Sequence, residues 1–434
     1  MAVPSRKPRL KFDPTRVTSV TMPSQEEYKG EIVAFYHFYK PDDVVSAVHF
    51  SDLCEGLVDR GWHVTMMTSN RYCRYGGVIP ERTETIDGVT VKRVWRPGFD
   101  QASNILRVIN SLWLQSAWVW AMRKMPKPDI IVVGTDPQFS QFMLPWLRRV
   151  CPDTKIVYWS FDVYPEAIQA DTNSKLVGGI ANLIAGLVSR CYRSVHVMVD
   201  IGSCMRRLLR RHLHSAKEVT LVPWALSEPG FDIPVNAEVR SAMFGENVKL
   251  GVLYSGNMGK AHEYDNFLEL ARFLRSKAPE VVFAFSARGN RMEEFTQALT
   301  DDDTNIKILP FATQEELEDR LNAADIHLLS LKDNWAGIVV PSKFFGSLAA
   351  GKPVLYSGAA TSCIGRWIEQ YDLGLLIQQE NIEEIASKLV SYSRDPQQLQ
   401  NWKINAYQTY HERFSKKTIL DQWDDLLEEE LTPN

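Results

Sequence analysis

The chain alternates short apolar runs with segments of helical periodicity along almost its whole length. Glu31–Tyr39 predicts a buried strand, Ala47–Arg60 an amphipathic helix that ends at Gly61, and His63–Thr68 the next strand. Two strands joined through a helix form a parallel βαβ unit. Because the alternation continues, we expect an α/β fold of doubly wound, Rossmann-like domains with parallel sheets covered by helices on both faces.

The segment Ser227–Pro234 is rich in chain breakers and divides the alternation into two halves. The 434 residues fit two domains at about 100–200 residues per domain. We expect a flexible extension at 1–30, a first domain at 31–226, a linker at 227–237 and a second domain at 238–414. The last helix, within 415–434, carries Ile419, Trp423 and Leu427 on one face, and we expect it to cross back to the first domain.

Charge and cysteine content narrow the classes of function. Lys and Arg number 49 against 53 Asp and Glu, so the net charge of -4 provides no broad basic field and nucleic acid is not an expected partner. The cysteines form no Cys-x-x-Cys pair, and we expect reduced thiols in a cytoplasmic protein. They stand at positions 54, 73, 151, 191, 204 and 363.

Two turns of the second half suit phosphate groups. In Leu253–His262 a predicted strand runs into glycines that let a backbone approach a ligand, and we expect a helix to open there with a cation beside it. In Gly337–Gly346 a lysine falls in the first helical turn, which is unfavourable unless an anion binds. Ordinary solvated turns are the alternative. The candidate diphosphate residues are Gly256, Asn257, Gly259, Lys260, Ser342 as an N-cap, and Lys343, with Arg288 reaching the base or phosphates from the same sheet edge.

The ordered motifs resemble one family. Tyr254–His262, Asp325–Ser330 and Pro341–Pro353 resemble the nucleotide-sugar domain of family 4 glycosyltransferases, in particular those of bacterial polysaccharide assembly. Trp159–Glu166 is similar to the inter-domain loop of that group, and Leu221–Ala225 is similar to its hinge. The resemblance covers about residues 31 to 425. It implies the GT-B architecture, two domains facing across a cleft, and transfer with retention of anomeric configuration. The implied donor is a UDP-sugar or a GDP-sugar on the C-terminal domain, without a metal or other cofactor.

The chain departs from the family pattern at two places. The Glu-x7-Glu pair of the family, whose second Glu holds the ribose hydroxyls, is replaced by Ile338 and Gly346. The Gly-Gly of the first loop is replaced by Val44, Val45 and Ser46. Since glycine has no side chain to accept a ribose hydrogen bond, the backbone or another group must hold the ribose, or the donor binds more weakly.

Sugar transfer needs a group that stabilises an oxocarbenium-like centre. We expect Asp162 and Glu166 near the sugar, with a helix cap as the alternative role of Asp162, and His49 on the acceptor side. The run Asp301–Asp303 lies in a polar loop, and we expect a solvated turn rather than a metal site.

Two basic amphipathic segments point to a membrane-linked acceptor. Ile105–Arg123 combines tryptophans with basic residues, which suits a membrane interface, and Met205–Leu213 carries arginines at 206, 207, 210 and 211. We expect both on one face of the first domain. Helices that merely cover the sheet are the alternative. A peripheral position on the inner face of the plasma membrane follows from the first interpretation.

Together these features predict a glycosyltransferase that moves a sugar from a nucleoside diphosphate sugar to a lipid-linked or polysaccharide acceptor in cell-surface polysaccharide biosynthesis. A GT-B nucleotide-sugar epimerase, which needs no acceptor, is one alternative. A catalytically silent subunit of a polysaccharide assembly complex is the other, and the missing Glu pair favours it.

Overall fold

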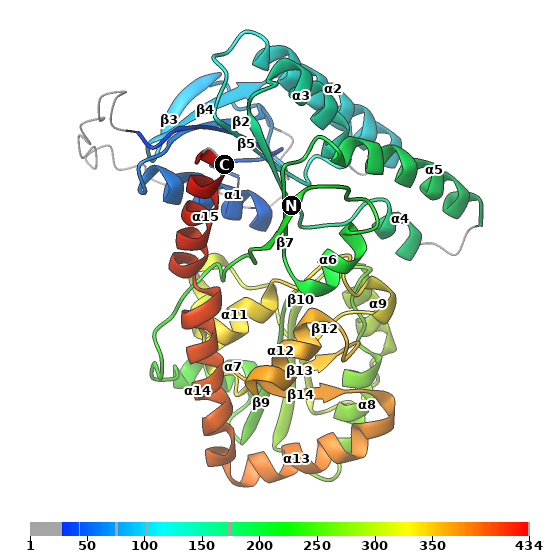
Figure 1. Ribbon diagram of the computed structural model, residues 1–434. Coiled ribbons are helices and arrows are strands. Elements are labelled where there is room, and N and C mark those ends of the chain that lie inside the picture. The colour runs from blue at the N-terminus through cyan, green and yellow to red at the C-terminus, as the bar shows by residue number, and fades with distance from the viewer. Residues whose placement is uncertain (1–27, 43, 74–76, 101–102, 172–174, 433–434) are drawn as a thin grey trace, which may run out of the picture.

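The computed structural model describes residues 28–42, 44–73, 77–100, 103–171 and 175–432. These residues form two α/β domains stacked one above the other (Figure 1). The predicted extension at 1–30 lies almost entirely outside the described residues.

An eight-stranded sheet forms the centre of the N-terminal domain, in the order β3-β4-β2-β1-β5-β6-β7-β8. All neighbours are parallel except β3, which pairs antiparallel with β4 through a turn at Asp87 and Gly88. The short, half-exposed β3 has no apolar run and was not predicted. The strands are β1 Glu31–Phe35, β2 His63–Ser69, β3 Thr83–Ile86, β4 Val89–Val94, β5 Ile130–Gly134, β6 Lys155–Trp159, β7 Val197–Asp200 and β8 Lys217–Thr220.

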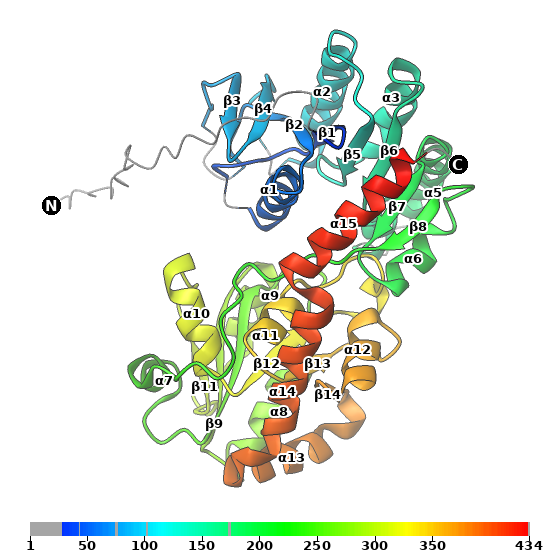
Figure 2. The same cartoon turned by 60° about the vertical axis from the view of Figure 1, so that its left-hand side comes forward.

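Helices cover both faces of this sheet. The crossover helices α2, α3 and α5 lie side by side on one face, and α1 lies on the other face together with the last helix, α15 (Figure 2). The short helices α4 and α6 lie toward the C-terminal domain (Figures 1 and 2). Their bounds are α1 Val45–Val58, α2 Asn104–Met122, α3 Leu144–Val150, α4 Glu166–Ala170, α5 Lys175–Tyr192 and α6 Ser203–Leu209.

The C-terminal domain has a six-stranded, all-parallel sheet in the order β11-β10-β9-β12-β13-β14. Its strands are β9 Leu250–Asn257, β10 Val281–Arg288, β11 Ile306–Ile308, β12 Ile326–Ser330, β13 Val354–Ser357 and β14 Gly374–Ile377. Its helices are α7 Ala237–Phe244, α8 Asp265–Leu274, α9 Asn290–Ala298, α10 Gln314–Ala323, α11 Lys343–Ala349, α12 Cys363–Tyr371, α13 Ile382–Arg394 and α14 Gln400–Thr409.

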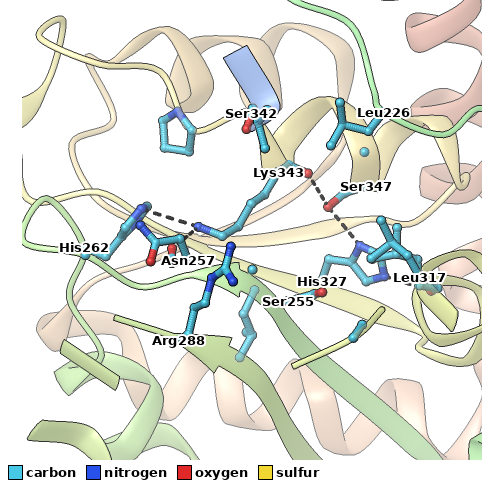
Figure 3. A pocket seen from close by; sticks show the side chains of 18 of the residues that line it. Leu226, Ser255, Asn257, His262, Arg288, Leu317, His327, Ser342, Lys343 and Ser347 are labelled. Carbon is cyan, nitrogen blue, oxygen red and sulfur yellow. Dashed lines mark hydrogen bonds between the residues drawn. The ribbon is translucent and has the colours of Figure 1, made fainter. Parts of the chain in front are cut away.

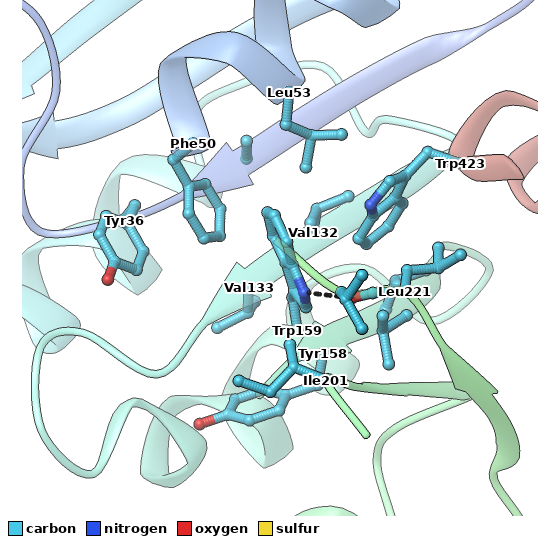
Figure 4. Close-up of a cluster of buried hydrophobic side chains, with 14 of the residues drawn as sticks. Tyr36, Phe50, Leu53, Val132, Val133, Tyr158, Trp159, Ile201, Leu221 and Trp423 are labelled. Atoms are coloured by element: carbon cyan, nitrogen blue, oxygen red, sulfur yellow. Dashed lines mark hydrogen bonds between the residues drawn. The ribbon is translucent and has the colours of Figure 1, made fainter. Parts of the chain in front are cut away.

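The last helix, α15 (Lys416–Leu431), leaves the C-terminal domain and packs on α1 of the N-terminal domain (Figure 2). Its Trp423 is fully buried against Trp159 of β6, with ring centroids 5.2 Å apart (Figure 4). An ion pair of 2.6 Å joins Asp421 to Arg60. A burial of this size contributes about 3–5 kcal/mol, the usual loss when a core Trp is truncated, so the helix ties the two domains together.

A disulfide also links the domains, and the prediction of reduced thiols is wrong for this pair. Cys204 lies in α6 of the N-terminal domain, Cys363 begins α12 of the C-terminal domain, and their Cα atoms are 5.6 Å apart. The two cysteines are 159 residues apart in sequence, so no spacing rule could pair them. Cys54, Cys151 and Cys191 are free thiols.

Candidate functional site

A cavity of about 1100 Å³ lies between the domains, at the carboxyl ends of the C-terminal strands β9 and β10. The N-terminal domain lines it with Val45, Val48 and His49 of α1. The C-terminal domain lines it with both predicted phosphate turns and with α10 (Figure 3). All seven predicted diphosphate residues are among the lining residues: Gly256, Asn257, Gly259, Lys260, Arg288, Ser342 and Lys343.

Lys343, the first residue of α11, brings a buried cation to the cavity. Its Nζ donates to the carbonyl oxygen of Asn257 at 2.6 Å and to the hydroxyl of Tyr254 at 3.3 Å. No carboxylate of the described residues lies within ion-pair distance of it. Burial lowers the pKa of Lys343 to about 7, because the charged form has lost water without gaining a counter-charge. An anion that enters the cavity would supply that counter-charge.

His262 completes the surroundings of this amine. Its Nδ1 lies 2.6 Å from the carbonyl oxygen of Ser330 and therefore donates, which leaves Nε2 as an acceptor 3.4 Å from Lys343 Nζ (Figure 3). Burial lowers the pKa of His262 to about 3, so the ring is neutral near pH 7. Gly256, at a φ of +114°, makes room for the lysine, since a Cβ there would lie 2.9 Å from Lys343 Cε. His262 lay within the quoted motif but was not singled out from the sequence.

Lys260 contacts the other domain rather than the floor of the cavity. Its Nζ pairs with Asp171, just after α4, at 2.6 Å. The helix expected after this turn, α8, begins at Asp265, so a short loop separates the glycines from its N-terminus. Ser342 occupies the N-cap position of α11, but its side chain makes no capping hydrogen bond.

Arg288 lies at the end of β10 with its guanidinium 4.1 Å from the ring centroid of Phe311. The next residue, Gly289, has a φ of +115°, and a Cβ there would lie 2.7 Å from the carbonyl oxygen of Met258. This close approach keeps the two strand-end loops together. Arg288 and Phe311 form an exposed cationic and aromatic wall of the cavity.

Open space surrounds Gly346, at the position where the family carries its ribose-holding Glu. A Cβ built there meets no heavy atom within 4 Å, and Gly346 lines the cavity. Ile338, at the other position of the pair, is buried. Neither residue offers a ribose ligand.

His49 is the predicted catalytic residue that lines the cavity. Its ring stands edge-on to Trp224 at 5.4 Å, and both ring nitrogens are buried without a hydrogen-bond partner among the described residues. Burial lowers the pKa of His49 to about 4, so the ring is neutral near pH 7. A neutral imidazole can donate or accept one hydrogen bond to a substrate hydroxyl.

The two predicted carboxylates differ in their surroundings, and neither lines the cavity. Asp162 lies in the loop after β6, where the amide of Val163 donates to the carbonyl of Ile338 in the other domain at 3.1 Å. Burial and the charge of Asp136 raise the pKa of Asp162 to about 6. Glu166 is instead bound to His212 at 2.6 Å. The other carboxylate oxygen, Oε2, is buried without a hydrogen-bond partner among the described residues, and the placement of Glu166 near the sugar stays a prediction.

Other polar residues at the strand ends of the N-terminal domain were not predicted. His37, after β1, lies 3.2 Å from Asp136, after β5, and its Nε2 is buried without a partner among the described residues. Arg71 donates to the carbonyl oxygen of Arg96 at 2.9 Å, and neither guanidinium lies within ion-pair distance of a carboxylate of the described chain. In the sequence, only the position of these residues just after predicted or observed strands could have marked them as candidates for the site.

The acidic run Asp301–Asp303 is only partly solvated. Asp301 and Asp302 are exposed, but Asp303 is buried and bonded to Arg272 at 2.8 Å. The Arg272 guanidinium lowers the pKa of Asp303 to about 2. The expected solvated turn is therefore corrected for Asp303, which anchors the β11 side of the sheet.

Family models match both domains of the chain. Residues 46–225 match the model described as "Glycosyl transferase 4-like domain", and residues 245–409 match "Glycosyl transferases group 1". The two matches together span well over half of the chain.

Two curated relatives are glycosyltransferases by name. The chain is 25% identical over 248 residues, 57% of its length, to the probable glycosyltransferase WbjE of Pseudomonas aeruginosa. It is 25% identical over 221 residues, 48% of its length, to the putative colanic acid biosynthesis glycosyl transferase WcaI of Escherichia coli (strain K12). The matches span 61% and 53% of those two relatives.

Solved structures share the fold. WaaG, a glycosyltransferase involved in lipopolysaccharide biosynthesis, superimposes with a TM-score of 0.65 at 14% identity, over 91% of this chain and 99% of that one. Anabaena Alr3699/HepE in complex with UDP superimposes with a TM-score of 0.64 at 12% identity, over 92% and 100%. These neighbours confirm the predicted GT-B fold of two Rossmann-like domains. With both domain models matched, the chain belongs to the GT4-like glycosyltransferases of the GT-B fold.

Proposed function

We propose that the chain transfers a sugar, with retention of anomeric configuration, from a nucleoside diphosphate sugar to a saccharide or lipid-linked acceptor in cell-surface polysaccharide biosynthesis. The observation that carries the proposal is the buried Lys343 amine, which faces a large inter-domain cavity and has no carboxylate partner among the described residues. A buried cation without a counter-ion is costly. A diphosphate would supply the missing charge.

The remaining donor contacts follow from the cavity wall. Arg288 and Phe311 stand where a base could stack, and Lys260 could exchange its contact with Asp171 for a phosphate. We propose UDP as the nucleotide and GDP as the second choice. The fold neighbour HepE has been solved with UDP and with UDP-glucose, which supports a uridine donor by analogy.

The acceptor would lie against the N-terminal domain. His49 faces the cavity, and the neighbouring strand-end carboxylates of the same domain, Asp136 and Asp162, interact with each other, since the charge of Asp136 helps to raise the pKa of Asp162. Arg71 and Arg96 could hold an anionic group of the acceptor, such as a phosphate, because neither is engaged by a carboxylate. The relatives named for polysaccharide assembly favour an acceptor of that class.

Product analysis with purified protein tests this proposal. UDP-sugars and GDP-sugars would be incubated with short saccharides or prenyl-phosphate acceptors, and nucleotide release and the anomeric configuration of the product would be followed by NMR. We expect UDP release that depends on the acceptor. Epimerised donor without nucleotide release would favour the epimerase, whereas donor binding without any turnover would favour the silent subunit.

A further inference from the structure

Three helices of the N-terminal domain leave a broad apolar surface exposed. α2, α3 and α5 lie side by side on the sheet face opposite α1 and α15 (Figures 1 and 2). Ile105 of α2 is 74% exposed, Trp120 of α2 is 58% exposed, and Leu183 of α5 is 72% exposed. The other exposed apolar residues of this α2/α3/α5 face are Ile109, Leu112, Trp113, Trp146 and Leu187. Contiguous exposed apolar groups of this kind mark an interaction surface.

Charge on this face is of one sign. The three helices, 19, 7 and 18 residues long, contain no Asp or Glu, although the chain has 53 acidic residues. Exposed basic residues border the apolar groups: Arg123, Lys124, Lys127, Arg148, Arg149, Arg190 and Arg193. The face therefore combines apolar side chains with a positive field in a chain of net charge -4.

Tryptophan and basic side chains are paired on the face. Lys124 Nζ lies 3.8 Å from the ring centroid of Trp120, and the Arg149 guanidinium lies 5.3 Å from that of Trp146. A Trp ring among apolar side chains, with a Lys or Arg beside it, suits a bilayer interface. There Trp rings partition into the interface, and basic side chains contact the lipid phosphates. Among the described residues, no helix is long and apolar enough to cross a membrane.

The arginines of α6 do not belong to this face, contrary to the sequence-based expectation of one common surface. Arg206 pairs with Asp200 at 2.7 Å, and Arg210 pairs with Glu218 at 2.7 Å. α6 also lies next to the C-terminal domain, whereas α2 lies at the far end of the N-terminal domain (Figures 1 and 2). The positive surface is formed by α2, α3 and α5 instead.

We propose that the α2/α3/α5 face docks on a bilayer of anionic phospholipids, with the three helices lying in the interface. A partner protein or a second copy of the chain could also cover apolar groups, but three helices without acidic residues, bordered by more exposed basic residues than the exposed acids Asp129 and Asp153, complement an anionic surface best. Docking in this orientation leaves the C-terminal domain pointing away from the bilayer (Figure 1).

The face is continuous with the acceptor side of the N-terminal domain. Trp95, which is exposed, packs edge-on against Trp113 of α2 with ring centroids 5.4 Å apart. The next residue, Arg96, is the buried arginine beside Arg71. A lipid phosphate would therefore pass from the docked face to these arginines. The path of a lipid phosphate to these arginines rests on the proposed function, whereas the docking of the α2/α3/α5 face on a bilayer does not.

Vesicle flotation tests the docking without any measurement of activity. The full chain would be mixed with vesicles of phosphatidylcholine containing 30% phosphatidylglycerol, and with vesicles of phosphatidylcholine alone, at low and physiological salt. We expect binding to the anionic vesicles that weakens as salt screens the charges over about 8 Å. Failure of the wild-type chain to float with anionic vesicles at low salt would overturn the proposal.

Two variants and a matched control locate the surface. Lys124→Glu with Arg149→Glu should lower the vesicle partition coefficient about 30-fold or more, since each basic residue near an anionic surface contributes about fivefold. Trp113→Ser, Trp120→Ser and Trp146→Ser together should abolish binding. Arg207→Ala with Arg211→Ala, two exposed arginines in α6 and just after it, should leave binding unchanged.

The oligomeric state of the chain shows whether the α2/α3/α5 face binds a bilayer or a second copy of the chain. Light scattering should show the same mass for the wild-type chain and for the triple Trp variant. A wild-type dimer that this variant dissolves would overturn the proposal in favour of self-association. Should the triple variant fail to fold by circular dichroism, the charge-reversed variant, which alters only exposed side chains, still decides the outcome.

Discussion

The two domains share an architecture but differ in the charged groups at their strand ends. In the C-terminal domain the cations Lys343 and Arg288 face the cavity, and no carboxylate of the described residues lies within ion-pair distance of either. In the N-terminal domain the strand ends carry charges of both signs: Asp136 lies 3.2 Å from His37, the pKa of Asp162 is raised to about 6, and Arg71 has no carboxylate partner among the described residues. The strand ends of the C-terminal domain therefore suit an anion, whereas those of the N-terminal domain combine acids with bases, although each domain is built on a largely parallel sheet.

The N-terminal side gives the largest expected effect. Asp162→Asn should lower kcat by at least about 100-fold with little change in donor affinity, as for loss of an acid-base group. Because the pKa of Asp162 is raised to about 6, its carboxylate is protonated below that pH, and the wild-type rate should fall as pH drops through 6. Rate profiles of both proteins against pH would check this. An unchanged acid limb in the variant would remove Asp162 from the mechanism.

The carboxylate of Glu166 provides the contrast. Glu166→Gln weakens the bond to His212, and we expect it to lower the free energy of unfolding by about 1–3 kcal/mol while kcat stays near that of the wild type. Urea denaturation and steady-state rates measure the two effects. A loss of kcat equal to that of Asp162→Asn would restore the sequence-based pairing of the two carboxylates.

The C-terminal side is tested through Lys343. Lys343→Met should weaken UDP-sugar binding about 10- to 150-fold, the range for one or more lost charge-assisted contacts of about 1.5–3 kcal/mol. Lys352→Met is the matched control, because Lys352 is also buried but donates to the carbonyl oxygen of Asn322 outside the cavity. Titration calorimetry on both variants makes the comparison. Equal losses would mean that burial, not the cavity, explains the effect.

Proton uptake should accompany donor binding. The free amine of Lys343 has a pKa of about 7, and a bound diphosphate favours its charged form. Above pH 7 binding must therefore take up a proton, and UDP-sugar affinity should fall by up to about tenfold per pH unit from 7 to 9. Calorimetry in buffers of different ionisation enthalpy detects the proton. The pH dependence should vanish in Lys343→Met, and its persistence there would assign it to another group.

The smallest effect concerns the open space at Gly346. Gly346→Glu should strengthen UDP-sugar binding about 2- to 12-fold, because a carboxylate there can accept a ribose hydrogen bond of about 0.5–1.5 kcal/mol. Gly346→Ala controls for the better helix propensity of the variant. An affinity for Gly346→Glu that only matches the Ala variant would show that ribose lies elsewhere.

Much of the fold followed from the sequence because apolar periodicity is a local property. β1 and β2 begin at Glu31 and His63, as predicted, but the parallel strand β4 (Val89–Val94) was not predicted. The antiparallel strand β3 was not predicted either, because Thr83–Ile86 is short and half-exposed.

The site was less accessible to sequence reasoning. The lining lysines and glycines could be predicted because they lie within two contiguous turns. The partners of Glu166 and Asp303, the surroundings of His49 and the bond between Cys204 and Cys363 depend on residues far apart in the chain. Only the folded arrangement shows which charges are already neutralised.

The inter-domain disulfide determines how the enzyme can open. A covalent bond between α6 and α12 fixes one point of the domain boundary, so the domains can only rotate about it and cannot separate there. Displacement grows with distance from that pivot. It is therefore greatest at the edge away from the disulfide, where α1 and α10 lie on the two sides of the domain boundary and both contribute residues to the cavity wall (Figure 2). The α6–α12 side stays closed as long as the disulfide is intact, so any opening of the cavity takes place at the α1–α10 side.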